Sequence, residues 1–279
     1  MTAAGIETTD RGLDADGYIA REGALSRVPD AFAPVVEAAR TRIAESFGPS
    51  LLHSAYLYGS IPRGTAVPGV CDLDLLLALR REPTADDRAA AADVLAALDA
   101  EFPQIMGGGV LLFSEPVLLS ELERYDLGWF LACLCTPLLG EDLAARLPRY
   151  RPSSLLARET NGDLAAAIPR WRERLAEAVA AEGSEDELRA LGRSVSRRLV
   201  RTGFTLVMPR WGGWTSDLTA SVEIFARYYP ERAERMRTAL TVARTRSGDA
   251  ALLTMLVEEL APWLAAEYTA VHGEKAPRG

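Results

Sequence analysis

Residues 56–79 read YLYGSIPRGTAVPGVCDLDLLLAL, and this stretch decides the expected fold. It begins and ends in apolar runs of strand character, which are separated by Gly-Ser, Arg-Gly and Pro-Gly pairs that favour turns. Two aspartates, Asp72 and Asp74, lie one residue apart inside the second run. We therefore expect two neighbouring strands, over residues 51–58 and 71–79. The polar turn residues and the two aspartates would lie where the first strand ends and the second begins.

The spacing of the two aspartates predicts a cation site. In a strand, residues two apart point to the same face, so Asp72 and Asp74 project together while Leu73 covers the other face. Two such carboxylates repel each other and lose hydration unless a cation neutralises them. Magnesium prefers oxygen ligands, and carboxylates at this spacing can bridge a metal pair that serves phosphoryl or nucleotidyl transfer. Taken alone, the D-x-D pattern also fits a solvated pair at a strand end.

The Gly-Ser pair before the aspartates predicts contacts to phosphate. Gly59 allows a phosphate to approach the main chain closely, and Ser60 offers a hydroxyl group. A short helix is expected to begin at Pro62, and Arg63 adds a fixed positive charge. One site would thus combine groups that bind phosphate with residues that bind a metal ion.

The rest of the chain indicates two different halves. Apolar periodicity predicts helices over 29–48 and 84–102, the second with Thr84 and Asp87 at capping-box spacing, and a third strand over 107–119 interrupted by Pro116. From about residue 120 onward only helical patterns remain, one of them kinked or split at Pro169. We expect an α+β fold: a small mixed β-sheet domain with flanking helices, followed by an all-α helical bundle. The expected boundaries are a mobile leader over 1–28, a catalytic domain over 29–140 and a helical substrate-binding domain over 141–279.

Composition limits the partners. The net charge is −8 and no dense Lys/Arg run is present, which disfavours long nucleic acid and anionic membranes and suits a small, possibly cationic molecule. Three cysteines without a C-x-x-C pair indicate reduced thiols in a cytoplasmic protein. No apolar run is long enough for a membrane span, and the polar N-terminus lacks signal-peptide character.

These residues resemble the signature of the DNA polymerase beta-like nucleotidyltransferase superfamily. The resemblance rests on Tyr58-Gly59-Ser60, Arg63-Gly64 and Cys71-Asp72-Leu73-Asp74-Leu75. Within the superfamily, the chain looks similar to the antibiotic nucleotidyltransferases of the streptomycin/spectinomycin type. It implies that Asp72 and Asp74 are magnesium ligands and that Gly59 and Ser60 contact a nucleoside triphosphate. The superfamily usually has a third carboxylate on a later strand, as metal ligand or base. Glu115 is the available candidate, although a Glu before Pro at a strand end is often simply exposed.

The acceptor is less well indicated. Trp211, Trp214 and Asp217 could hold a sugar or aminocyclitol bearing ammonium groups, or could equally pack a helix junction and cap the next helix. We expect an enzyme that moves AMP from ATP to a hydroxyl of a small polar acceptor such as an aminoglycoside, with two magnesium ions and a role in antibiotic resistance. The alternatives are a protein or tRNA acceptor, and a non-catalytic, antitoxin-like regulatory module. The sequence does not indicate the oligomeric state.

Overall fold

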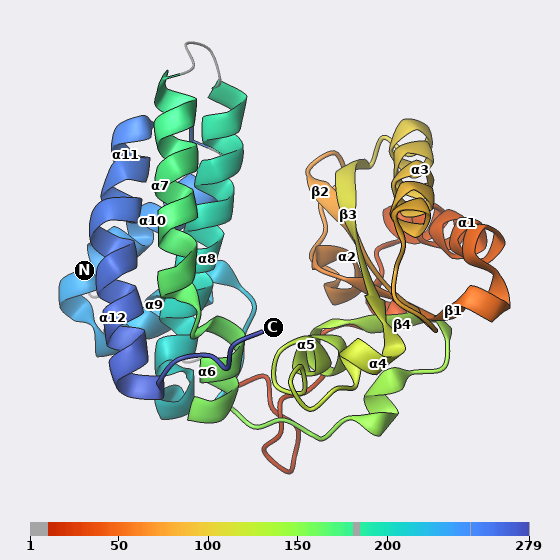
Figure 1. The fold of residues 1–279 in the computed structure, drawn as a ribbon, viewed down its shortest axis with the longest axis horizontal. Coiled ribbons are helices and arrows are strands. Elements are labelled where there is room, and N and C mark those ends of the chain that lie inside the picture. The colour runs from red at the N-terminus through yellow and green to blue at the C-terminus, as the bar shows by residue number, and fades with distance from the viewer. Residues whose placement is uncertain (1–10, 181–184, 246, 279) are drawn as a thin grey trace. The chain divides into compact units, whose positions relative to one another are not determined.

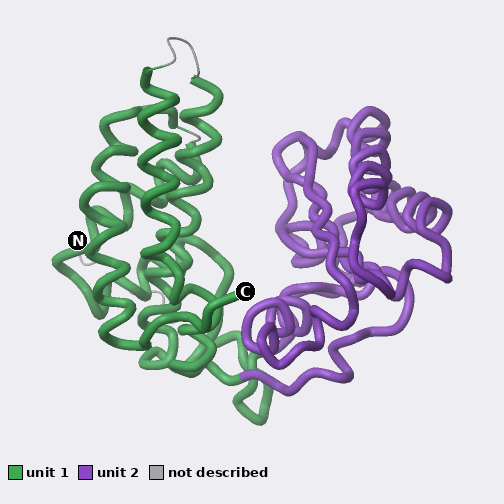
Figure 2. The backbone as a smooth tube through the Cα atoms, in the orientation of Figure 1, with its two compact units in different colours: residues 1–19, 151–279 green, residues 20–150 purple. Residues whose placement is uncertain are grey.

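The computed structural model describes residues 11–180, 185–245 and 247–278. The chain divides into two compact units, one formed by residues 20–150 and the other by residues up to 19 together with those from 151 onward (Figure 2). The boundaries expected from the sequence, at residues 28 and 140, stay predictions.

The first unit is built on a four-stranded mixed sheet (Figure 1). Its strand order is β3-β2-β1-β4, in which β1 pairs antiparallel with both β2 and β4, and β2 pairs parallel with β3. The strands are β1 (Leu52–Tyr58), β2 (Cys71–Leu79), β3 (Ile105–Ser114) and β4 (Thr136–Gly140). The mixed sheet, with helices around it and a helical unit beside it in sequence, confirms the expected fold class.

Alternation along β2 assigns the two faces of the sheet. Leu73, Leu75 and Leu77 are buried in one core with residues of α1 and α3, whereas Leu76 and Ala78 are buried in a second core with residues of α4 and α5. Thr84 and Asp87 form the expected capping box at the start of α3. The helices of this unit are α1 (Ala33–Leu51), α2 (Ser60–Arg63), α3 (Ala85–Glu101), α4 (Glu115–Leu118) and α5 (Leu127–Leu134), with short 3-10 turns at Leu25–Arg27, Asp30–Phe32 and Leu143–Arg146.

The second unit is helical. Its elements are α6 (Ser154–Asn161), α7 (Leu164–Ala180), α8 (Glu185–Trp211), α9 (Leu218–Tyr228), the 3-10 turn Pro230–Arg232, α10 (Ala233–Thr245), α11 (Ala250–Met255), a π-helical turn (Leu256–Leu260) and α12 (Ala261–His272). Its core contains a polar link, in which the Tyr268 hydroxyl donates to the Ala157 carbonyl at 2.6 Å. Among the described helices, none is both long and apolar enough to cross a membrane.

Three local expectations need correction. A fourth strand, β4, exists although only helices were expected beyond residue 120; it is short and carries Pro137, which an edge strand tolerates. Pro116 does not interrupt a strand but lies in the first turn of α4, directly after β3 ends at Ser114. Pro169 lies inside a continuous α7, and the break falls earlier, between α6 and α7.

The described part of the predicted leader is held by specific contacts. In the helical unit, Leu13 and Ile19 form an isolated β-bridge, and the Trp214 amide donates to the Arg11 carbonyl at 2.8 Å. In the sheet unit, Arg21 donates to Asp142 at 2.8 Å. Residues 11–28 therefore belong to the two units, while residues 1–10 of the predicted leader lie outside the described residues.

Candidate functional site

The two aspartates lie on one face of β2, at the end where the strand begins. Asp72 and Asp74 are both half-buried, and alternation places them on the face that Leu76 and Ala78 continue into the second core. Asp74 is paired with Tyr58, the last residue of β1. The carboxylates therefore stand at the point where β1 ends, as the sequence predicts.

Gly59 follows Tyr58 and lies against Asp74. Its backbone has φ +84° and ψ −150°, a conformation that is essentially restricted to glycine. A Cβ atom added at Gly59 would stand 2.5 Å from Oδ2 of Asp74, closer than any ordinary contact. The absence of a side chain at this residue is therefore what lets the Asp74 carboxylate occupy its place. This contact joins the Gly-Ser pair and the acidic pair into one site.

The remaining predicted phosphate contacts lie on α2, directly after Gly59. Ser60 is the first residue of this four-residue helix, so the helix begins two residues before the expected Pro62. The helix ends at Arg63, whose guanidinium lies 3.5 Å from the Glu22 carboxylate, and the left-handed Gly64 follows. Ser60 and Arg63 thus follow Gly59 on one short helix, while Arg63 has an acidic neighbour, Glu22, that the sequence did not indicate.

Glu115 does not join this site. β3 runs parallel to β2, with Gly109 opposite Asp74 and Ser114 opposite Leu79. Glu115 follows Ser114, so roughly 17 Å of strand, at about 3.3 Å per residue, separate it from the level of Asp74. There it forms an ion pair with Arg146, and its carboxylate lies 3.9 Å from Nε2 of His53. This corrects the sequence-based placement of Glu115 as the third carboxylate.

The donor set at the site fits magnesium. Asp72 and Asp74 supply hard oxygen ligands, and magnesium is commonly held by one or two carboxylates together with waters and substrate phosphates. The close approach of Gly59 to Oδ2 of Asp74, where an added Cβ would stand at 2.5 Å, keeps this carboxylate beside the Gly-Ser turn, where a substrate phosphate would complete the ligand set. The described residues contain no group of three or more His, Cys, Asp or Glu side chains suited to a metal, so a closed all-protein metal cage is not indicated there.

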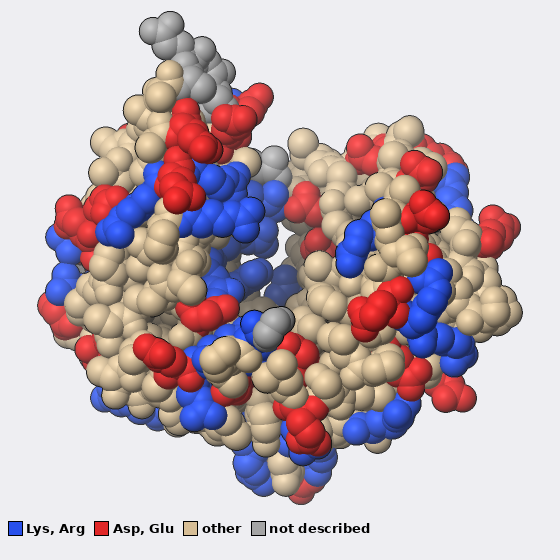
Figure 3. All heavy atoms as spheres, viewed as in Figure 1, with Lys and Arg blue, Asp and Glu red and all other residues tan. Residues whose placement is uncertain are grey.

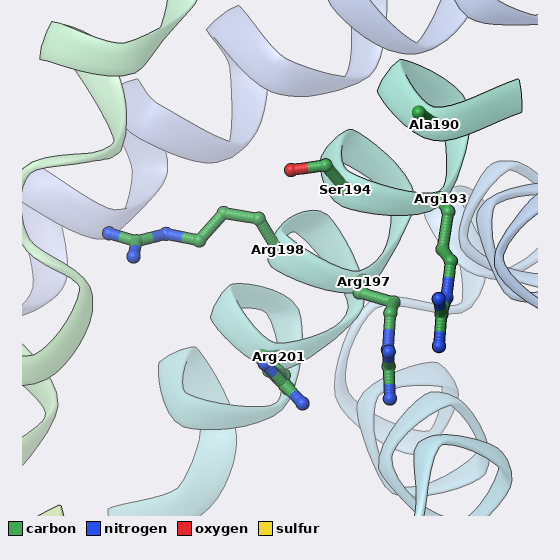
Figure 4. Close-up of a pocket in the computed structure, with 6 residues that line it drawn as sticks. All are labelled: Ala190, Arg193, Ser194, Arg197, Arg198 and Arg201. Atoms are coloured by element: carbon green, nitrogen blue, oxygen red, sulfur yellow. The ribbon is translucent and has the colours of Figure 1, made fainter. Parts of the chain in front are cut away.

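The helical unit carries a basic pocket that was not predicted from the sequence. Arg193, Arg197 and Arg201 follow each other at four-residue intervals along α8 and extend to the same side of the helix (Figure 4). With Ala190, Ser194 and Arg198 they line a pocket of about 480 Å³. Basic side chains gather over α7 and α8 in the space-filling view (Figure 3). The four-residue period of these arginines was the available signal, because residues four apart lie on one face of a helix although they form no consecutive Lys/Arg run.

The aromatic segment considered for the acceptor has structural contacts. Trp211 and Trp214 are buried and pack edge-to-face against Phe204, with ring centroids 5.9 and 5.5 Å apart. The Asp217 side chain caps α9 by accepting from the Ala220 amide at 2.7 Å. Of the two alternatives that the sequence left open, packing and capping is the one that the structure shows.

Comparison with known proteins supports the fold. Neither a protein-family model nor a curated protein matches the sequence. Among solved structures, the chain is similar to the spectinomycin adenyltransferase AAD(9) from Enterococcus faecialis, crystallised with ATP and spectinomycin. The TM-score is 0.50 at 14% sequence identity, and the match covers 85% of this chain and 98% of the other. The arrangement of the chain is therefore that of a nucleotidyltransferase-like fold.

Proposed function

We propose that this protein is a nucleotidyltransferase that moves a nucleoside monophosphate, AMP from ATP, to an oxygen of a small polar acceptor. The observation that carries the proposal is the contact of the Asp74 carboxylate with Gly59, which places an acidic pair beside a Gly-Ser turn. The nucleotidyltransferase-like fold supports it, since the similar protein is an adenyltransferase crystallised with ATP.

Each site residue has a role in this proposal. Asp72 and Asp74 would hold Mg²⁺, which when bound neutralises negative charge on the triphosphate. The Gly59 main chain and the Ser60 hydroxyl would contact the β- and γ-phosphates, and Arg63 would add a positive charge near them. Two magnesium ions, as predicted from the sequence, would need ligands from the substrate phosphates as well as from the two aspartates.

The chain's own contribution would be positioning and electrostatics. The rigid start of β2 and the glycine turn would fix the triphosphate so that an acceptor oxygen stands in line with the bond that breaks. The acceptor oxygen attacks the α-phosphorus, and pyrophosphate leaves with the electron pair of the broken bond. Fixed charges near the phosphates stabilise the charge that develops during this transfer.

The proposal is tested by transfer of label from [α-³²P]ATP in the presence of Mg²⁺. Asp74→Asn keeps the shape of the side chain but removes its charge, and we expect a loss of transfer of at least about 100-fold with thermal unfolding little changed. Asp93→Asn, at an exposed residue in the middle of α3, is the matched control and should keep full activity. Activity within about tenfold of the wild type in folded Asp74→Asn protein would refute the assignment.

The same assay separates the alternatives predicted from the sequence. Label on a small molecule supports the proposal, and label on a protein or tRNA supports a macromolecular acceptor. Bound ATP without any transfer supports the non-catalytic module. An aminoglycoside acceptor, resistance to an antibiotic and a cytoplasmic location stay predictions.

A further inference from the structure

We propose that Glu22 is a positioning residue of the donor site, which holds Arg63 in place for the β- and γ-phosphates of ATP. This role rests on the proposed function, and it extends the site to residues 21–27, a segment that was expected to be part of a mobile leader. All of the residues involved lie in the sheet unit, within residues 20–150.

The chain segment that carries Glu22 is fixed by main-chain hydrogen bonds. The Glu22 amide donates to the Cys133 carbonyl of α5 at 2.9 Å, and the Ala24 amide donates to the Pro62 carbonyl at 3.0 Å. The second bond ties the segment directly to α2, one residue before Arg63. The Glu22 side chain therefore starts from a backbone whose place is set by α5 and α2 together.

The same segment packs closely against both α2 and β4. A Cβ added at Gly23 would stand 2.4 Å from Oγ1 of Thr136 and 3.0 Å from Cβ of Pro62. Directly after α2, a Cβ added at Gly64 would stand 2.9 Å from the Arg27 carbonyl oxygen. The lack of a side chain at these two glycines lets the segment lie directly against α2.

The Glu22 carboxylate reaches Arg63 from this fixed backbone. Its Oε2 atom lies 3.5 Å from Nη1 of Arg63, and the two side chains are 17% and 29% exposed. Salt screens an ion pair that is partly removed from water less than it screens one on the open surface. Such a pair restricts the arginine side chain, which would otherwise sample many rotamers.

The orientation of Arg63 matters because of its place and its chemistry. Arg63 ends the four-residue helix α2, three residues after Ser60, so the two side chains are neighbours on the helix surface. A guanidinium binds phosphate through paired hydrogen bonds, which require a defined orientation. Because Glu22 already restricts the guanidinium, less side-chain freedom is lost when the triphosphate binds. Glu22 would thus favour binding of ATP although its own charge has the same sign as the phosphates.

The sign of one mutational effect separates positioning from simple repulsion. Glu22→Gln keeps the size of the side chain but removes a negative charge near the phosphates, so repulsion alone predicts tighter binding of a triphosphate. Positioning predicts weaker binding. We expect the Kd of α,β-methylene-ATP with Mg²⁺, measured by calorimetric titration of the full-length protein, to rise by about tenfold.

Two controls accompany this measurement. The affinity for AMP, which lacks the β- and γ-phosphates, should stay within about twofold of the wild type in Glu22→Gln, which also shows that the variant is folded. Glu37→Gln is the matched variant, because Glu37 forms an ion pair of similar length, 3.7 Å, with Arg40 on α1. It makes the same change in net charge and should leave both affinities unchanged.

A double-mutant cycle tests whether Glu22 acts through Arg63. Adding Glu22→Gln to Arg63→Met should change the Kd of the ATP analogue by less than about twofold, because the group that Glu22 positions is already gone. Tighter or unchanged binding in Glu22→Gln, equal losses for AMP and the analogue, or independent effects of the two substitutions would overturn the role of Glu22 and leave the proposed function standing. A wild-type protein that binds the analogue no better than AMP would instead refute the phosphate contacts of the proposed function, and the role of Glu22 with them.

Discussion

Replacement of Gly59 by alanine gives the sharpest test of how the site is built. A Cβ at this residue would stand 2.5 Å from Oδ2 of Asp74, whereas ordinary contacts begin at 3.4 Å. The carboxylate would therefore have to move by about 0.9 Å, and a displacement of about 1 Å in a catalytic group can cost on the order of 100-fold in rate. Because the Asp74 side chain can turn away, the steric clash itself should change the free energy of unfolding little. The glycine-only backbone conformation should cost about 1–3 kcal/mol in free energy of unfolding.

The matched control is Gly69→Ala. Gly69 also has a positive φ, +72°, but nothing lies within 4 Å of a Cβ added there. Urea unfolding should show a loss of about 1–2 kcal/mol for this variant, similar to that of Gly59→Ala. Transfer of label from [α-³²P]ATP should fall at least about 100-fold in Gly59→Ala, which corresponds to about 2.7 kcal/mol of transition-state stabilisation, and stay near the wild-type rate in Gly69→Ala. Equal activity in the two variants would refute the reasoning that Gly59 sets the position of Asp74.

Three further substitutions test separate parts of the sheet unit. Gly109→Glu should place a third carboxylate beside Asp74, because a Cβ at this residue would lie 4.0 Å from Oδ1, and should raise transfer to hydroxyl acceptors, measured with a labelled glycerol or sugar panel; transfer unchanged from the wild type would contradict the placement of this residue beside the site. Thr84→Ala removes one half of the capping box of α3 and should lower the free energy of unfolding by about 0.5–2 kcal/mol in urea, with transfer unaffected. Burial raises the pKa of Tyr56 to about 12, above its ordinary value near 10, so its contribution to stability is complete below pH 10 and is lost as the pH rises toward 12. Tyr56→Phe should flatten that alkaline loss in a pH series of melting curves, while leaving the Leu143 amide without its hydroxyl partner and lowering stability at neutral pH by about 1–3 kcal/mol.

Local patterns in the sequence predicted the part of the site that local geometry controls. The strand period of two placed Asp72 and Asp74 on one face and Leu73 on the other, which the two separate cores confirm. The Thr84 capping box was predicted for the same reason, since its hydrogen bonds span only three residues.

Pairing between distant segments could not be predicted in the same way. Glu115 has a suitable side chain, but its place depends on the parallel register of β3 with β2, which carries it toward the far end of β2. β4 lacks a strong strand pattern and forms because β1 offers a free edge for Thr136–Gly140. The four-residue spacing of the arginines on α8 can be read from the sequence. That this face of the helix lines a pocket depends on how the helices pack, which the spacing does not reveal.

The alternation along β2 has a consequence for insertions and deletions in this strand. Residues Leu75 to Leu79 are all apolar, so a shift by one residue would still present apolar side chains to both cores. The same shift would turn Asp72 and Asp74 toward α1 and α3, where two carboxylates would be buried in a hydrocarbon layer. The acids therefore discriminate between the two registers that the leucines alone would accept. We expect related chains to vary freely in the apolar side chains of β2 and to keep its length constant.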